Sequence, residues 1–108
     1  MKLIVNKSRL TNFSADEFLR RAGFAYIYDN IREHGSYVKR LSGDHYPRLH
    51  VYVMEKQDKE GRDLIVIEMH LDQKQASYKG VKMHNAEYDG EVVEAEINNL
   101  KNLMRNYV

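Results

Sequence analysis

The chain has 108 residues and a mass of 12.8 kDa, which predicts one domain over residues 1–108 with one modest core. Its hydrophobic content of 43% argues against disorder, and a formal net charge of +1 gives no overall field that would attract nucleic acid or a membrane. The absence of cysteine excludes disulfides and thiolate metal sites. No apolar run approaches the roughly 20 residues of a membrane span, and the opening apolar run is too short for a signal peptide. We therefore expect a cytoplasmic protein with no membrane partner.

A short helix is predicted over residues 15–22. Ser14 and Glu17 have the spacing of a capping box, in which each side chain bonds the free backbone N–H of the other residue. Gly23 suits the left-handed residue that commonly follows the end of a helix.

Four segments then show strand character. They are residues 24–30, 35–41, 48–56 and 62–72. The third alternates most clearly, with Leu49, Val51 and Val53 on one face and the polar series that contains His50 on the other. Consecutive strands pair most simply as antiparallel neighbours, and Gly61 fits a turn in the charged loop between the last two. KLIV near the start is a candidate for a short edge strand.

The last predicted element is an amphipathic helix that Asp89 can cap. Its apolar residues are spaced by four, three and four positions and form one stripe: Val93, Ile97, Leu100 and Met104. The predicted order is therefore α-β-β-β-β-α. This is an α+β domain whose antiparallel sheet carries both helices on one face and leaves the other face partly open.

The histidines concentrate the candidate chemistry on the open face. His50 and His70 lie opposite the main apolar series of their own strands, so we expect them diagonally near one another beside Arg48 and Tyr52. The polar stretch 73–88 follows directly, and a stretch of this length without a predicted element is more often functional than idle in a small domain. It brings five further candidates: Lys74, Tyr78, Lys79, His84 and Glu87.

The first functional hypothesis is binding of RNA or another phosphate-containing ligand on this face, with metal-free cleavage of a phosphodiester. RNA supplies its own nucleophile, and an enzyme adds a base, an acid and cations around the phosphorus. The catalytic roles would fall to His50, His70 and Lys74. Ligand binding would fall to Arg48, Tyr52, Tyr78 and Lys79. The same residue types also serve binding without catalysis, so the sequence leaves open whether the protein is an enzyme.

Two alternatives from other functional classes stand beside this hypothesis. One is a divalent metal cofactor, since imidazoles and a carboxylate suit zinc or a similar ion, although no fixed ligand spacing supports it. The ligands would be His50, His70 and His84, completed by Asp72 or Glu87. The other is a non-catalytic protein-interaction module, such as a homodimer formed through the tyrosine-rich strand at residues 24–30. The plainest interpretation is that the histidines only hydrogen-bond tyrosine or aspartate on the sheet.

The predicted order of elements is similar to the double-stranded RNA-binding fold. Within that group, residues 18–41, FLRRAGFAYIYDNIREHGSYVKRL, resemble the opening of HicA-type mRNA interferase toxins, in which a short helix and a strand precede a Gly-Ser-His triplet. The resemblance covers residues 14–54 and implies cleavage of mRNA by the histidine of the triplet. Here the triplet reads Gly35-Ser36-Tyr37, so a nuclease activity would depend on His50, His70 and His84 instead.

Overall fold

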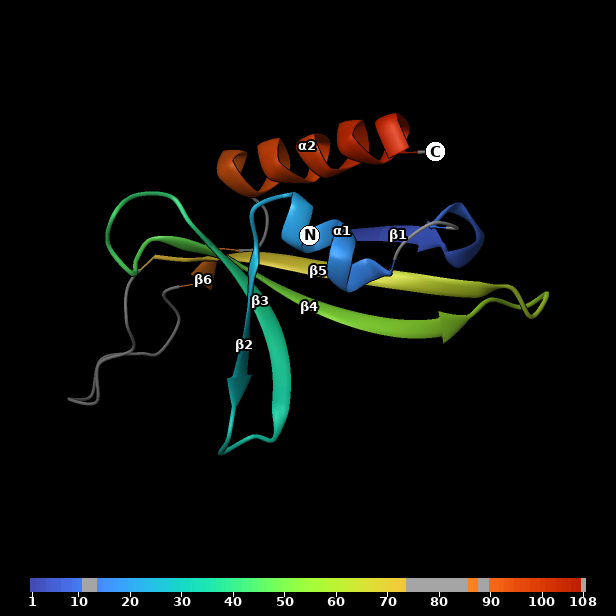
Figure 1. Ribbon diagram of the computed structural model, residues 1–108, viewed down its shortest axis with the longest axis horizontal. Coiled ribbons are helices and arrows are strands. Elements are labelled where there is room, and N and C mark those ends of the chain that lie inside the picture. The colour runs from blue at the N-terminus through green and yellow to red at the C-terminus, as the bar shows by residue number, and fades with distance from the viewer. Residues whose placement is uncertain (11–13, 74–85, 88–89, 108) are drawn as a thin grey trace.

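The computed structural model describes residues 1–10, 14–73, 86–87 and 90–107. The strands are β1 (Lys2–Asn6), β2 (Ala25–Asp29), β3 (His34–Arg40), β4 (Arg48–Gln57), β5 (Asp63–Asp72) and β6 (Ala86–Glu87). The helices are α1 (Ala15–Arg21) and α2 (Glu91–Tyr107), and a short 3-10 turn, η1 (Lys7–Arg9), follows β1. All described strands form one antiparallel sheet in the order β1-β5-β4-β3-β2, with β6 paired to β5 (Figure 1). The predicted α+β class and antiparallel sheet are confirmed.

Helix α1 begins with one of the two predicted capping-box bonds and ends at the predicted glycine, while the Glu17 side chain pairs with Arg21 instead of completing the box. The Glu17 backbone N–H donates to Ser14 Oγ at 3.2 Å, which satisfies one of the free donors of the first turn. At the other end Gly23 has a φ of +97°. Its N–H donates to the Arg20 carbonyl, and the next N–H, that of Phe24, donates to the Leu19 carbonyl. These bonds form a Schellman motif, which ends the helix and turns the chain into β2.

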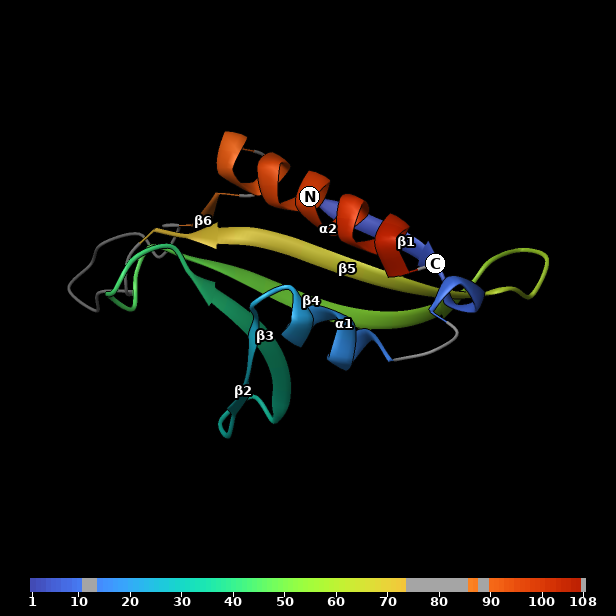
Figure 2. The same cartoon turned by 45° about the horizontal axis from the view of Figure 1, so that its top comes forward.

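One hydrophobic core lies between the two helices and one face of the sheet. Helix α2 contributes the predicted stripe of Val93, Ile97, Leu100 and Met104. The strands contribute alternate residues, among them Leu49, Val51, Ile67, Met69 and Leu71. Because α1 places Phe18 and Leu19 in the same cluster, both helices cover the same face of the sheet, as predicted. In Figures 1 and 2 helix α2 runs alongside β5.

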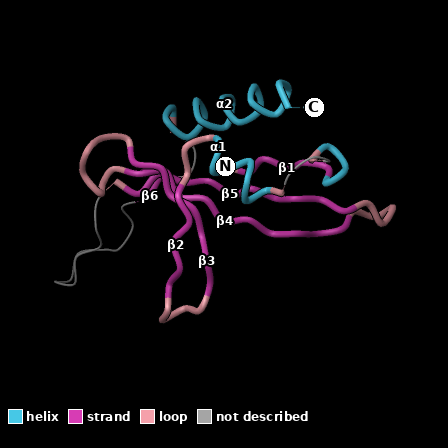
Figure 3. The backbone as a smooth tube through the Cα atoms, in the orientation of Figure 1, coloured by secondary structure: helices cyan, strands magenta, loops and turns pink. Residues whose placement is uncertain are grey.

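The KLIV segment forms an edge strand, as the sequence suggested. Strand β1 pairs with β5, with Leu3 opposite Ile67 and Val5 opposite Ile65. Leu3 and Val5 are buried in the core, whereas Ile4 between them is 60% exposed on the other face. The alternation follows from the period of two in a strand. The start of the chain therefore pairs with β5, the last long strand. The β2–β3 hairpin lies at the other end of the strand order (Figure 3).

The pairing of β4 with β5 corrects the predicted register. His50 lies directly opposite His70, not diagonally, because Gln57 pairs with Asp63 and the turn is therefore centred near residue 60. Asp58 stabilises this turn, since its Oδ1 accepts the backbone N–H of both Glu60 and Arg62. Moving the centre of a hairpin turn by one residue moves every cross-strand partner by two positions.

The polar stretch predicted at 73–88 is shorter than expected. Ala86 and Glu87 form β6, which pairs with Asp72 and Leu71 on the same edge of β5 as β1, beyond the residues that β1 covers. Asp89, the predicted cap of α2, lies outside the described residues. Within the described ranges, no helix combines the length and the apolar composition that crossing a membrane would need.

Candidate functional site

Seven side chains from three adjacent strands form a cluster on the sheet face opposite the helices, which we call the histidine cluster. Strand β3 contributes His34 and Ser36, β4 contributes Arg48, His50 and Tyr52, and β5 contributes His70 and Asp72. Leu49 and Val51 of β4 point into the core, so His50 between them must emerge on the other side. The predicted segregation of the histidines from the apolar series is confirmed.

Asp72 connects both histidines of the cluster. Its Oδ2 lies 2.9 Å from His50 Nδ1, and its Oδ1 lies 2.9 Å from His70 Nε2. Arg48 Nε approaches the same carboxylate at 3.3 Å. Burial alone would raise the pKa of Asp72, but the hydrogen bonds from His50 and His70 outweigh it and hold the pKa of this carboxyl well below its usual range. Asp72 is therefore ionised at neutral pH and can only accept hydrogen bonds.

This charge state assigns the protons on the two imidazoles. Because an ionised carboxylate carries no proton, His50 Nδ1 and His70 Nε2 must each donate one to Asp72. His50 Nε2 lies 2.8 Å from Ser36 Oγ. A neutral His50 therefore accepts from the Ser36 hydroxyl at this atom. If Nε2 carries a proton instead, the same hydroxyl can rotate and accept, so Ser36 supports either form of the ring.

Ser36, His50 and Asp72 share the order of a Ser-His-Asp catalytic triad. In a triad the serine oxygen attacks a substrate carbonyl, so it must be reachable from outside. Only 5% of Ser36 is exposed, and the residue lies in the middle of β3. The arrangement therefore fits a serine that orients an imidazole better than a serine that acts as a nucleophile.

Tyr52 packs against both imidazoles. Its ring centroid lies 4.7 Å from that of His50 and 5.8 Å from that of His70, and the planes are inclined by only 26° and 22°. The two imidazole centroids are 4.9 Å apart. This packing helps to leave only 9% of His50 and 8% of His70 exposed. The face is thus less open around the histidines than the sequence predicted, because the neighbouring side chains cover one another.

The structure brings together five of the predicted site residues: His50, His70, Arg48, Tyr52 and Asp72. Four others lie outside the described residues, namely Lys74, Tyr78, Lys79 and His84. Of Glu87 only the backbone is described, in its pairing with Leu71. Ser36 was not a predicted site residue, because its place beside His50 follows from the pairing of β3 with β4, which the sequence did not specify.

Tyr37, the third residue of the Gly35-Ser36-Tyr37 triplet, faces the helices. Tyr37 is buried in the core, and its hydroxyl donates to Asp16 Oδ1 of α1 at 2.6 Å. Its neighbour Ser36 points to the opposite face and contacts His50. A side chain at position 37 would therefore not join the histidine cluster.

The cluster contains three side chains that could together hold one metal ion. One donor atom each from His50, His70 and Asp72 can be chosen so that all three lie within 4.8 Å of one another. Among the described residues this is the one group of three or more such side chains with that property. With metal–ligand bonds near 2.1 Å, neighbouring ligand atoms lie roughly 3.0 to 3.4 Å apart in octahedral or tetrahedral coordination. The two nitrogen–oxygen distances of 2.9 Å are close to this range, whereas the three chosen donor atoms lie up to 4.8 Å apart, so the side chains would have to rotate toward one another to bind an ion.

Comparison of the chain with protein-family models, with curated proteins and with solved structures found no match. A functional assignment therefore depends on the geometry of the histidine cluster. That geometry offers two imidazoles, one ionised carboxylate and one guanidinium at a mostly buried position of the sheet.

Proposed function

We propose that this protein binds one divalent transition-metal ion through His50 Nδ1, His70 Nε2 and Asp72. One observation carries the proposal: two imidazoles direct nitrogens, each at 2.9 Å, at the two oxygens of one ionised carboxylate. A metal ion would replace the two protons that these groups share. Two imidazoles with a carboxylate suit zinc, iron(II), cobalt(II) and manganese(II) better than calcium or magnesium, which prefer oxygen ligands.

Ser36 supports this proposal from outside the ligand set. An imidazole that binds a metal through one nitrogen usually donates its other N–H to a carboxylate, a carbonyl or water, which orients the ring. With a metal at Nδ1, His50 would carry its proton at Nε2, 2.8 Å from Ser36 Oγ. The hydroxyl would then accept this bond.

Three protein ligands would leave the ion at least one open coordination position. In enzymes such a position holds a water whose pKa the metal lowers, or a substrate oxygen that the metal polarises. Arg48 lies beside the site and is partly exposed, so its guanidinium could bind an anionic group of a substrate. The activity that we favour is therefore metal-dependent hydrolysis of a small phosphate-containing substrate.

Metal-free cleavage of RNA by His50 and His70 is the second candidate function. Arg48 and Tyr52 beside the imidazoles favour it, because a cation and an aromatic ring suit a phosphate and a base. Acid–base catalysis requires each imidazole to come within about 3 Å of a substrate atom. His50 uses both ring nitrogens in hydrogen bonds, and 9% of it is exposed. A small ion reaches such a position more easily than a polymer does, which ranks the metal site first.

Metal titration of the protein after removal of metals with EDTA tests the proposal. Adding zinc or cobalt(II) should raise the midpoint of thermal unfolding, by the order of 10 °C when the free ion is at about 100 times its dissociation constant. His70→Gln should abolish this rise. Ser36→Ala should reduce the rise by less than His70→Gln does, because Ser36 is not a metal ligand. His45→Gln is the matched control, because His45 is exposed in the loop before β4. The control should respond to the metal as the unchanged protein does.

The imidazole NMR resonances provide the second readout, which does not depend on stability. The proposal requires cobalt(II) to shift or broaden the resonances of His50 and His70 before that of His45. An equal response of all three histidines, or none, would contradict it. A phosphodiester substrate then separates the two candidate functions: cleavage that EDTA abolishes supports the metal centre, whereas cleavage that persists in EDTA and is lost in His50→Gln supports acid–base catalysis.

A further inference from the structure

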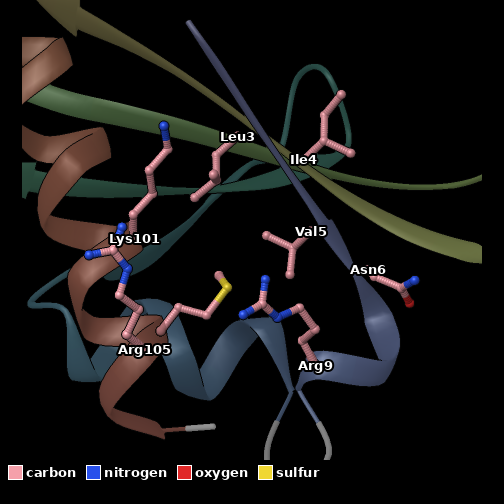
Figure 4. Close-up of a pocket in the computed structure, with 8 residues that line it drawn as sticks. Leu3, Ile4, Val5, Asn6, Arg9, Lys101 and Arg105 are labelled. Atoms are coloured by element: carbon pink, nitrogen blue, oxygen red, sulfur yellow. The ribbon is translucent and has the colours of Figure 1, made fainter.

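A groove lies between β1, η1 and α2, away from the histidine cluster (Figure 4). Leu3 and Val5 line it from β1 and point toward the helices, whereas the histidine cluster lies on the opposite face of the sheet. Its volume is about 330 Å³. This is within the range of roughly 300 to 1,000 Å³ that small-molecule sites occupy.

The floor of the groove is apolar. Leu3, Val5 and Met104 line it, and all three belong to the hydrophobic core. Figure 4 shows the side chains of Leu3 and Val5 directed into the groove and that of Ile4 directed away from it. A ligand in the groove would therefore cover apolar surface of the core with its own apolar part.

Three cations surround this floor. Arg9 comes from η1, and Lys101 and Arg105 come from α2, while none of the described residues that line the groove is acidic. In the part of the chain that the structure describes, none of the three forms an ion pair or a side-chain hydrogen bond. Other arginines of the protein do form ion pairs, for example Arg20 with Asp16 at 2.9 Å. The groove thus gathers three unpaired positive charges in a protein whose net charge is +1.

Helix electrostatics explain only part of this arrangement. Cations are favoured near the C-terminus of a helix, where the macrodipole is negative, and this accounts for Arg105 in the last turn of α2. Arg9 belongs to a different element and lies on the other wall of the groove. Arg9 thus adds a third positive charge to the lining of the groove, and a bound anion would offset the repulsion among these charges.

We propose that the groove binds a small phosphomonoester that carries an apolar body. The phosphate would lie between the guanidinium groups of Arg9 and Arg105, which can each offer two parallel N–H donors to phosphate oxygens. Lys101 would add a third charge toward the phosphate dianion. The apolar body would pack on Leu3, Val5 and Met104. This site is independent of the metal centre, because it shares no residue with the histidine cluster.

Methyl NMR with phenyl phosphate tests both halves of the proposal. Phenyl phosphate should shift the methyl resonances of Leu3, Val5 and Met104 in a saturable manner. Inorganic phosphate, which lacks the apolar ring, and phenol, which lacks the charge, should each bind more weakly. Arg9→Gln and Arg105→Gln should each weaken phenyl phosphate binding roughly tenfold or more, since hydrogen bonds to charged groups are lost. His70→Gln should leave it unchanged.

Lys59→Gln is the control for general loss of positive charge, because Lys59 is exposed in the β4–β5 loop and does not line the groove. Equal weakening by Lys59→Gln and Arg105→Gln would overturn the proposal, as would phenol binding as strongly as phenyl phosphate. A ten-nucleotide single-stranded RNA provides the last arm. If the RNA shifts these methyl resonances and phenyl phosphate does not, the groove is a nucleic-acid surface and the proposal is wrong.

Discussion

The hydroxyl oxygen of Ser36 lies 2.8 Å from His50 Nε2, on the side of the imidazole opposite to Asp72. Three neighbouring strands thus each supply one member of a hydrogen-bonded chain, from β3 through β4 to β5. Because both ring nitrogens are bonded, the His50 ring cannot turn over without breaking two hydrogen bonds. The ring is therefore oriented before any ligand binds, and pre-orientation reduces the entropy that binding would cost.

The first prediction follows from this orientation. Ser36→Ala removes the partner of His50 Nε2, and the loss of such an outer partner typically weakens metal binding about 10- to 100-fold. We expect a decrease of this size in zinc affinity, measured by competition with a chromogenic chelator. Ser42→Ala is the matched control, because Ser42 lies in the exposed loop between β3 and β4. Equal zinc affinities of the two variants would show that Ser36 has no role in the site.

The second prediction concerns the charge beside the proposed metal. Arg48 Nε lies 3.3 Å from Asp72 Oδ2, so the guanidinium would repel a divalent ion bound to the same carboxylate. Arg48→Gln should therefore raise metal affinity several-fold while it weakens binding of a phosphate-containing substrate. Arg32→Gln, at an exposed position in the β2–β3 turn, should change neither quantity. Weaker metal binding in Arg48→Gln would mean that the arginine orients Asp72 more than it repels the ion.

The parts of the fold that could be predicted are those that local pattern determines. Alternation in β4 places His50 on the face opposite Leu49 and Val51 whatever the rest of the chain does, and this prediction is confirmed. The spacing of four, three and four residues likewise predicts the buried stripe of α2. The diagonal placement of His50 relative to His70 was wrong, because the register depends on where the hairpin turns and the charged loop allows several turns.

The remaining features depend on contacts between distant segments. Ser36 is one polar residue within a strand, and nothing in its local sequence indicates that it meets an imidazole 14 residues later. The groove joins Arg9 to Arg105 only because β1 pairs with β5 and α2 packs over the same face. The roles assigned to Lys74, Tyr78, Lys79 and His84 remain predictions, since these residues lie outside the described ranges.

The third prediction tests the packing of α2 on the sheet. Leu100 is fully buried, whereas Val92 on the same helix is 43% exposed. Leu100→Ala should lower the free energy of unfolding by about 2 to 5 kcal/mol, because it removes buried apolar atoms and leaves a cavity. Val92→Ala should change it by no more than about 0.5 kcal/mol. Urea denaturation measures both values. A Val92→Ala variant as unstable as Leu100→Ala would mean that α2 turns a different face to the core.

The fourth prediction uses the bond between α1 and β3. Burial, followed by the hydrogen bond to Asp16, raises the pKa of Tyr37 from 10.0 to about 12. The unfolded chain therefore loses this proton first as the pH rises. Consequently the contribution of Tyr37 to stability is complete below about pH 10 and is lost as the pH approaches 12.

The free energy of unfolding of Tyr37→Phe should therefore fall less between pH 9 and pH 12 than that of the unchanged protein, since phenylalanine has no proton to release. Urea denaturation at a series of pH values from about 9 to 12 measures the difference, because this series contains the whole pKa shift from 10.0 to about 12. Tyr28→Phe, at a residue that is 53% exposed in β2, controls for removal of a tyrosine hydroxyl and should retain the full alkaline loss. If Tyr37→Phe and the unchanged protein lose stability in parallel over this range, the hydroxyl of Tyr37 titrates alike in the folded and unfolded chains. The hydrogen bond from Tyr37 to Asp16 would then not raise the pKa of this tyrosine when the protein is in solution.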